Sequence, residues 1–431
     1  MSSVDTYTSQ GIPPGIVEAS SGTGWRSNSH LSLAIILGLG VVSVMDAMIL
    51  SSLLTPIKQE FGFADEQIGR LAALFTIAGI LGAPFFGALA NRFGRKRVLV
   101  LGVVIWSVAS LSTGLAGGFI GLLFWRVLTG FGEAAYNSIA PSWLADLYRP
   151  KWRNLVFSLY MIKNKIGTAC ALALGGWIAA AYDWRTAFFV AGVPGLLLAA
   201  SLAWGREPEI GATEGGPRST PAQPKSGLRL NFAVFRYPAY VLHLAGLVFF
   251  FTAMSVQIWI PAYLHRTFEI SNLQASSFLA QILLYTLPAG LIGGYLSSLL
   301  LRRFRWGFPA FLSVTSFLAA AAFFQAYTTP SLDIARIYIA VAIACFGFSA
   351  GTLTTLVVEA VPATLRNDAT SLSVVLTSGI AGVVGPEVVG ALSDAYSLQT
   401  AVLVAPVAYF VAGIIWAVLA GFRALEKALA A

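Results

Sequence analysis

The chain has 431 residues, of which 57% are hydrophobic and only 11% are charged. Soluble domains carry about 25% charged residues, so this composition excludes a water-soluble fold and indicates a protein surrounded by lipid. The net charge of +8 does not indicate nucleic-acid binding, because the Lys and Arg residues cluster in short loops between apolar runs, where they set membrane topology.

The apolar runs predict twelve transmembrane helices, since a helix needs about twenty apolar residues to cross a bilayer core. The first thirty residues are polar and lack the basic start, apolar run and cleavage site of a signal peptide, so a cytoplasmic tail is expected over 1–30. Long runs without alternation exclude a β-barrel. The predicted helices lie near 31–53, 68–90, 98–116, 119–146, 155–181, 185–204, 237–263, 273–300, 307–326, 333–360, 366–392 and 399–421.

One long polar segment, rich in Gly, Pro, Ser and Thr, divides these helices into two groups of six. It predicts a flexible cytoplasmic linker over 205–236. The flanking bundles are expected over 31–204 and 237–422, with a short cytoplasmic tail over 423–431. Parallel six-helix repeats with a binding site at their interface are one known transporter plan.

The loops alternate in charge along the chain. The loops after the second, fourth and eighth predicted helices carry several Lys and Arg residues, and the loop after the first helix carries Glu60, Asp65 and Glu66. By the positive-inside rule, both termini and the linker are cytoplasmic, in a multi-pass protein of the inner (plasma) membrane.

The loop after the second predicted helix contains Gly87, Asn91, Arg92, Gly94 and Arg95. This run resembles the signature G-x-x-x-D-R-x-G-R-R/K of the major facilitator superfamily, with Asn91 in place of the usual Asp. Gly87 is expected to allow close helix packing and Gly94 to turn the loop. A charge-pair latch through Asn91 would be weaker than one through Asp.

Two acidic residues near cytoplasmic helix ends complete the expected conformational gate. Asp146 is followed seven residues later by Arg153, and Glu359 is followed at the same spacing by Arg366. The repeated spacing indicates related halves and predicts the pairs Asp146–Arg153 and Glu359–Arg366.

The fourth predicted helix contains Arg126, Gly130, Gly132, Glu133 and Tyr136, followed by Ile-Ala-Pro and Ala-Asp. This pattern resembles the Spinster family of the same superfamily. The resemblance implies a transporter of lysophospholipids or sphingolipid-type molecules, with two pseudo-symmetric six-helix bundles. Spinster proteins usually have Asp-Arg in the first helix, whereas here Asp46 is followed by Ala47.

Arg126 and Glu133 are seven residues apart and so lie on one helix face. The helix rise places Glu133 and Asp46 about 20 Å from the cytoplasmic ends of their helices. Carboxylates near the bilayer midplane are costly, so they are expected to face a cavity or a partner. Desolvation favours the protonated carboxyl group, which predicts proton coupling through Asp46, Glu133 and Arg126. The alternative is a static buried ion pair.

Polar residues inside other helices are candidates for substrate binding. Lys163 and Lys165 are about 200° apart around their helix; Lys163 aligns with small residues that suggest a packing face, whereas Lys165 is placed to neutralise Glu133 or to bind an anionic head. The alternatives are snorkelling of both lysines and hydrogen bonds between helices. The candidates are Lys165, Lys163, Asn164, Asn137, Tyr136, Gln257, Gln281, Tyr285 and Glu387.

The sequence therefore predicts an all-α membrane protein that is a proton-coupled secondary transporter of amphipathic lipids. The alternative is a transporter of small organic anions or a drug-efflux antiporter, and a receptor without net transport is a third possibility. The absence of a G-x-x-x-x-G-K-[ST] loop argues against ATP-driven transport, and no residue pattern indicates enzyme chemistry or a metal site. We expect a monomer that uses protons as coupling ion, with no cofactor.

Overall fold

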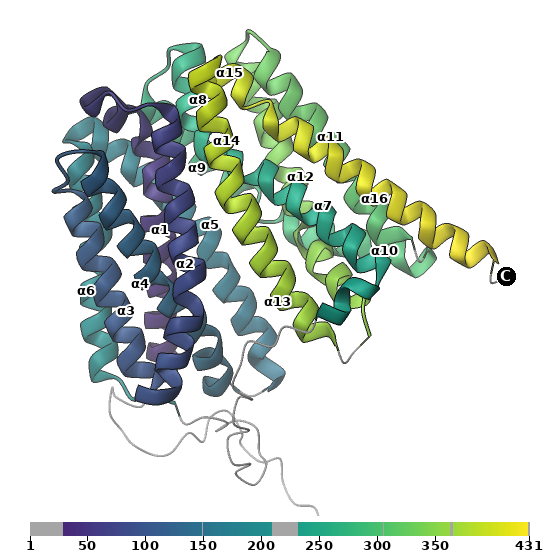
Figure 1. Ribbon diagram of the computed structural model, residues 1–431, viewed down its shortest axis with the longest axis horizontal. Helices are drawn as coiled ribbons and strands as arrows, with labels where there is room; N and C mark the ends of the chain where they lie inside the picture. Colours follow the sequence, from purple (N-terminus) through teal and green to yellow (C-terminus); the bar gives the residue numbers. More distant parts are fainter. Residues whose placement is uncertain (1–28, 149, 209–231, 305, 363–364, 430–431) are drawn as a thin grey trace, which may run out of the picture.

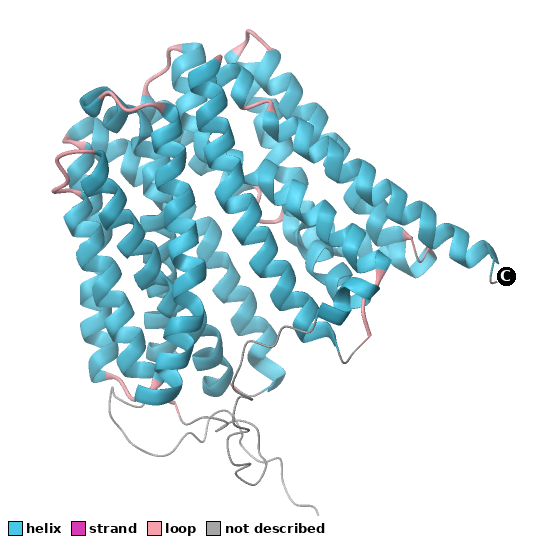
Figure 2. Ribbon diagram, in the orientation of Figure 1, coloured by secondary structure: helices cyan, strands magenta, loops and turns pink. Residues whose placement is uncertain are grey.

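The computed structural model describes residues 29–148, 150–208, 232–304, 306–362 and 365–429, and the regular structure of this part is helical (Figure 2). Almost all of the predicted tail over 1–30 and most of the predicted linker over 205–236 lie outside these residues. Among the described residues, nine helical stretches are long and apolar enough to cross a membrane. The predicted all-α membrane fold is confirmed.

The first half is the upright bundle in purple and blue at the left of Figure 1. The apolar runs form these helices close to their predicted positions, but α1 continues well beyond its predicted end at 53. Residues such as Leu54 and Ile57 extend its buried face past that point. The helices are α1 (Ser29–Phe61), α2 (Asp65–Phe93), α3 (Arg95–Thr113), α4 (Phe119–Leu147), α5 (Pro150–Ala181) and α6 (Trp184–Trp204).

The second half, in teal, green and yellow (Figure 1), follows the short helix η2 (Phe232–Arg236) and also makes six passes. Several passes are interrupted. They are α7 (Pro238–Ser255), η3 (Val256–Trp259) and α8 (Ile260–Phe268); α9 (Asn272–Tyr285) and α10 (Ala289–Arg303); α11 (Gly307–Thr328); α12 (Leu332–Glu359); α13 (Arg366–Leu376), η5 (Thr377–Ala381) and α14 (Gly382–Ala395); and α15 (Leu398–Ala401) and α16 (Val404–Leu429).

These interruptions correct the sequence-based prediction of continuous helices over 237–263, 273–300, 366–392 and 399–421. Pro288 has no N–H group and therefore ends α9 before α10 begins. The segment η5 is a π-helical turn, a local feature that occurs often at functional sites. The last helix also runs on to Leu429, beyond its predicted end at 421.

The two halves meet mainly where α2 packs against α14 and α5 packs against α9. Figure 1 shows α2 and α14 side by side near the top and diverging toward the bottom, where α6, the helix before the linker, ends. We call this bottom side the linker end and the opposite side, with the α1–α2 loop, the outer end. The loops rich in Lys and Arg, after α2, α4 and α10, all lie at the linker end.

The core of the second half is fixed by a hydrogen-bonded pair between α7 and α16. Trp416 Nε1 donates to His243 Nδ1 at 3.0 Å, so the ring hydrogen of His243 is on Nε2, which donates to the Leu353 carbonyl oxygen at 3.0 Å. Gly246 leaves room for the indole, since a β-carbon there would lie 2.7 Å from it. His243 is fully buried and links three helices.

Replacing Trp416 by Phe keeps a ring but removes the hydrogen-bond donor to His243. We expect the free energy of unfolding to fall by about 1–3 kcal/mol, because a buried acceptor is left without a partner. Thermal unfolding in detergent measures the change as a lower Tm. The exposed Trp204 is the matched control, and an equal loss of stability in Trp204→Phe would contradict the assignment.

Candidate functional site

Three charged side chains meet in the interior of the first half. Asp46 lies midway along α1, and Arg126 and Glu133 lie on α4; each is at most 5% exposed. Arg126 Nη1 lies 3.7 Å from Asp46 Oδ1 and donates to the Asp46 carbonyl oxygen at 3.2 Å. Arg126 Nη2 donates to the carbonyl oxygen of Ala47 at 3.3 Å. Ala47 therefore helps to bind Arg126 through its backbone carbonyl group.

The guanidinium group of Arg126 is held between two aromatic rings. Its Cζ lies 4.6 Å from the ring centroid of Phe75 and 5.9 Å from that of Phe188. Gly130 allows this arrangement because a β-carbon there would lie 2.3 Å from the Phe75 carbonyl oxygen. The glycine spacing of α4 thus brings α2 close enough for Phe75 to cover the cation.

The two carboxylates of this cluster are incompletely satisfied. Ser110 Oγ donates to Asp46 Oδ1 at 2.6 Å, whereas Asp46 Oδ2 and Glu133 Oε1 are buried atoms that have no hydrogen-bond partner among the described residues. Electrostatic interactions connect Glu133 with Asp46, Arg126 and Lys163. Burying an unsatisfied charged oxygen is unfavourable, and a proton on either carboxylate relieves that penalty. The chemistry available here is to hold and release a proton.

The structure places Lys163 inside the first half, where it is 5% exposed. Its Nζ lies 4.6 Å and 4.2 Å from the ring centroids of Tyr136 and Tyr160, and donates to Tyr160 Oη at 3.2 Å. Tyr136 Oη in turn donates to the Ile36 carbonyl oxygen at 2.9 Å. Aromatic rings thus enclose the ammonium group of Lys163, and the predicted substrate contacts of Lys163 and Tyr136 stay predictions. The predicted packing face of Lys163 agrees with this position.

Lys165 has a different environment, at the boundary between the halves. Its Nζ donates to the carbonyl oxygen of Thr286 at 3.0 Å and lies 3.5 Å from Thr286 Oγ1. Thr286 directly follows α9, and its carbonyl oxygen also accepts from the backbone N–H of Ala289 at 3.1 Å. Among the described residues, no carboxylate forms an ion pair with Lys165. Its positive charge is therefore available to an anionic group.

The other predicted substrate residues lie on helices of both halves. Asn137, Asn164 and Gln281 are exposed, and Tyr285 is 75% exposed. Gln257 lies in η3, with a buried Nε2 that has no partner in the described part of the chain.

The sixth of these residues, Glu387, has an ion-pair partner in the first half, and its predicted substrate contact stays a prediction. Its Oε1 lies 3.4 Å from Arg70 Nε of the first half. The structure therefore places Glu387 in an ion pair between the halves.

The loop between α2 and α3 has the turn that the sequence predicts, with Gly94 at φ 89°. Arg95 Nη1 pairs with Asp146 Oδ2 at 2.5 Å, and Asn91 and Arg92 are exposed. A β-carbon on Gly87 would have no neighbouring atom within 4 Å, which corrects the predicted role of Gly87 in close helix packing in this conformation.

The predicted partners of the remaining gate residues are only partly visible. Arg153 and Arg366 lie outside the described side chains, so their pairs with Asp146 and Glu359 stay predictions. Sequence reasoning missed Glu207, whose carboxylate accepts from the backbone N–H groups of Arg95 and Lys96 at 3.2 and 3.3 Å. The signal for Glu207 in the sequence was an acidic residue three positions after the end of the sixth helix.

Replacing Arg126 by Gln removes the cation that two backbone carbonyls and Asp46 share. We expect a loss of about 3–5 kcal/mol in the free energy of unfolding, because a buried charge loses its partner. Thermal unfolding in detergent measures the loss. Arg185→Gln breaks an ion pair between partly exposed side chains at 2.6 Å and is the control, with a change of about 1 kcal/mol or less. Equal losses of stability in the two variants would show that burial does not account for the stabilising contribution of Arg126.

Comparison with known proteins identifies relatives over most of the chain. Residues 36–386 match the family model described as Major Facilitator Superfamily. "Protein spinster" of Drosophila melanogaster is 24% identical over 400 residues, which cover 89% of this chain and 65% of that protein. "Sphingosine-1-phosphate transporter SPNS2" of Mus musculus is 32% identical over 245 residues, covering 54% of this chain and 43% of that protein. The chain thus spans less than two thirds of either relative.

A solved structure confirms the fold. The crystal structure of a bacterial homolog of the human lysosomal transporter Spinster, in an inward-facing and unoccupied conformation, superposes with a TM-score of 0.77. The sequences are 23% identical, and the alignment covers 93% of this chain and 97% of the other. The predicted arrangement of twelve helices in two bundles is therefore confirmed, as is the resemblance to Spinster proteins.

Proposed function

Because the chain belongs to the major facilitator superfamily and is a transporter of the Spinster type, we propose that it couples proton movement to transport of an amphipathic lipid. The lipid class is lysophospholipid or sphingolipid-like, and the mechanism is alternating access between the two halves. The observation that carries the proton coupling is the buried cluster of Asp46, Arg126 and Glu133, in which each carboxylate has one oxygen without a partner in the described part of the chain.

The cluster supports a switch that depends on its charge. With both carboxylates ionised, Arg126 is shared between Asp46 and Glu133, which both lie in a low-dielectric interior. A proton on either carboxylate removes one negative charge and weakens the attraction between that group and the Arg126 guanidinium. Since Arg126 also holds the backbone of α1 at Asp46 and Ala47, a change in its pairing is transmitted to the position of α1.

The orientation follows from the loop charges. The loops with several Lys and Arg residues share the linker end, which the positive-inside rule assigns to the cytoplasm. Near the outer end, Lys58, Arg185 and Arg266 lie singly on three different helices, so the excess of Lys and Arg is at the linker end. We therefore place the outer end on the opposite side of the membrane.

Lys165 supports a substrate with an anionic head group. Its ammonium group lies between the halves and binds a backbone carbonyl at the break between α9 and α10. An anionic head competes well for such a group, because its negative charge adds a Coulomb attraction to the ammonium group that the neutral carbonyl oxygen lacks. The mouse relative is named as a transporter of sphingosine-1-phosphate, a lipid with such a head.

The same feature supports a second candidate, transport of small organic anions, since Lys165 would bind a carboxylate without a lipid tail. Counterflow in proteoliposomes separates the two functions. Accumulation of sphingosine-1-phosphate or lysophosphatidylglycerol, with no accumulation of benzoate, is expected for the lipid transporter. The reverse pattern would replace the first proposal by the second.

Replacing Glu133 by Gln fixes this position in the uncharged form. We expect proton-driven accumulation of lipid in proteoliposomes to fall at least about tenfold, with counterflow exchange retained, because exchange needs no net proton movement. Asp46→Asn should behave in the same way. The control is Asp333→Asn, which changes an acidic side chain that is 89% exposed. Full pH-gradient dependence in both core variants would exclude the cluster from coupling.

Replacing Lys165 by Gln removes the cation but keeps hydrogen-bonding capacity. We expect KM for an anionic lysolipid to rise by roughly tenfold, the loss of one charge-assisted hydrogen bond, with little change for lysophosphatidylcholine. Lys165→Arg should restore part of the affinity for the anionic lysolipid. An equal effect on both lipids would indicate that Lys165 only joins the halves.

A further inference from the structure

A pocket of about 370 Å³ lies between the two halves at the outer end. Helices α1 and α5 of the first half form one side of it, and α8, α9 and the loop between them form the other. Because both halves contribute lining residues, the complete pocket exists only while the outer end is closed. Its polar wall consists of Thr55, Gln59, His265, Ser271 and Asn272.

The polar wall offers hydrogen-bond acceptors to a ligand. Thr55 is 7% exposed, and its Oγ1 is buried without a partner among the described residues. Asn272 Nδ2 donates to the Ser52 carbonyl oxygen at 2.5 Å, which leaves its Oδ1 as an acceptor. His265 Nδ1 lies 2.7 Å from the Ile270 carbonyl oxygen; this nitrogen therefore carries the hydrogen, and Nε2 of the neutral ring is an acceptor. Such a wall suits a ligand that brings hydroxyl groups.

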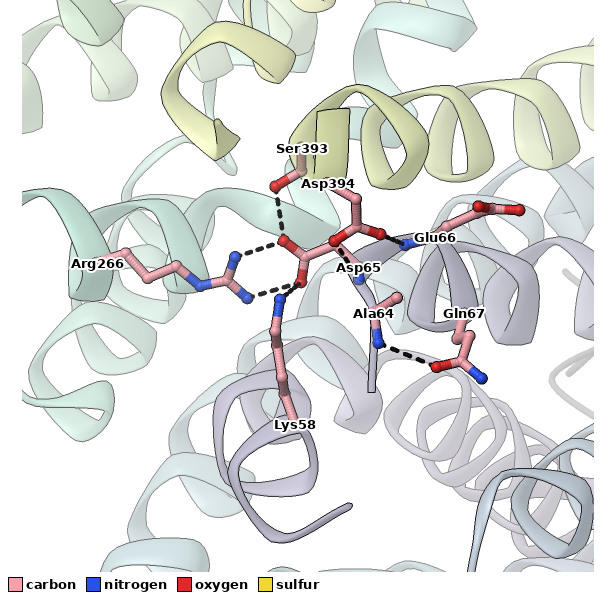
Figure 3. A network of polar contacts seen from close by, with 8 residues as sticks. All are labelled: Lys58, Ala64, Asp65, Glu66, Gln67, Arg266, Ser393 and Asp394. Carbon is pink, nitrogen blue, oxygen red and sulfur yellow. Dashed lines mark hydrogen bonds and ion pairs between the residues drawn. The ribbon is translucent and has the colours of Figure 1, made fainter. Parts of the chain in front are cut away.

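The pocket favours a neutral ligand. Its lining residues include no Asp, Glu, Lys or Arg. The cations next to the lining residues in the chain are Lys58 and Arg266, and both donate to Asp65, at 2.7 Å and 2.6 Å (Figure 3). Burying a charged group without a counter-charge is unfavourable, and an anion would also meet the acceptors of the polar wall. The charged neighbours are thus occupied with one another, and an uncharged ligand fits the pocket best.

Two aromatic residues on and after α5 mark the depth of the pocket in the membrane. Trp177 and Tyr182 are 51% and 69% exposed, and their ring centroids lie 6.2 Å apart. Exposed Trp and Tyr residues of a membrane protein gather at the level of the lipid head groups. The same turns of α5 contribute to the apolar wall of the pocket, which consists of Pro56, Gly176, Ala179, Ala180 and Leu273. The pocket therefore lies where the head of a lipid meets its tail.

We propose that this pocket binds the neutral, hydroxyl-bearing head of a lipid of the monoacylglycerol class, and that the bound lipid keeps the outer end closed. A ligand that contacts both halves binds the closed form better and shifts the population toward it. The site is separate from Lys165, because Asn272 and Thr286 lie at opposite ends of α9, about 20 Å apart by helix rise. The effect on conformation rests on the proposed alternating access, whereas the binding does not.

Native mass spectrometry of the full chain, released from detergent micelles and titrated with monolauroylglycerol, tests the binding. We expect a one-to-one adduct. Thr55→Val keeps the shape of the side chain but removes the hydroxyl group, so the apparent Kd should rise by roughly fivefold, the loss of one hydrogen bond. Ala179→Leu fills the pocket and should abolish the adduct. The matched control is Thr328→Val, an exposed residue at the outer end of α11 whose hydroxyl group donates to the Phe324 carbonyl oxygen at 2.8 Å; its Kd should not change.

Two further probes separate the lipid from other sources of the same chemistry. Methyl laurate has the tail without hydroxyl groups and should give no adduct that depends on Thr55 or Ala179. Glucose has hydroxyl groups without a tail and should also fail to bind. A glucose adduct that Ala179→Leu abolishes would overturn the lipid and assign the pocket to a free polyol. Equal affinity for monolauroylglycerol in Thr55→Val, Ala179→Leu and Thr328→Val would overturn the site itself.

Counterflow of lysophosphatidylglycerol in proteoliposomes tests the effect on conformation. We expect monolauroylglycerol to lower the maximal rate by roughly fivefold or more, a typical coupling between two sites, with KM unchanged and with no such effect in Ala179→Leu. A rise in KM alone would show that monolauroylglycerol competes on the transport path, and an unaffected rate despite binding would refute the closure. Binding that depends on Thr55 and Ala179, in a protein without any lysolipid counterflow, would refute the proposed function alone.

Discussion

The first half is organised around the burial of Arg126, a charge that lipid cannot solvate. Its guanidinium group is 2% exposed or less and must find its partners within the protein. It finds them in the backbone of α1, the carboxylate of Asp46 and the ring of Phe75. These contacts fix α1, α2 and α4 relative to one another. They also keep two carboxylates in a place where their protonation has structural consequences.

The two halves differ in how they accommodate polar groups within the membrane. The first half uses long helices and charged side chains in its interior. The second half interrupts its helices at η3, at the α9–α10 break and at η5. Two of these sites expose carbonyl groups that side chains of the first half reach, since Ser51 Oγ donates to the Ile258 carbonyl oxygen at 2.7 Å and Lys165 binds that of Thr286. Irregular backbone at membrane depth is tolerated only where protein or water satisfies it.

The charged networks at the two ends of the molecule also differ. At the outer end, Asp65 and Asp394 join the halves directly. At the linker end, Arg95 binds Asp146 and Glu207, which belong to the first half and to the start of the linker. The charged network at the linker end therefore stabilises one half, while that at the outer end holds both together. This difference explains why α2 and α14 touch at one end and diverge toward the other (Figure 1).

The sequence by itself determined the fold class, the number of membrane passes and the residues of the buried charge cluster. Hydropathy sets helix length, and intramembrane charges are so costly that each one is conspicuous. It also identified Gly94 as a turn, because few residues other than glycine adopt positive φ. Only the tertiary structure decided which polar residues share a neighbourhood. It separated Lys163, enclosed by tyrosines, from Lys165, two positions away at the boundary between the halves. It also joined Asp65 to Arg266 and Asp394, which lie far apart in the sequence. Helical periodicity gives the face of a single helix, but the partner of that face depends on how separate helices pack, and this is not encoded in any local pattern.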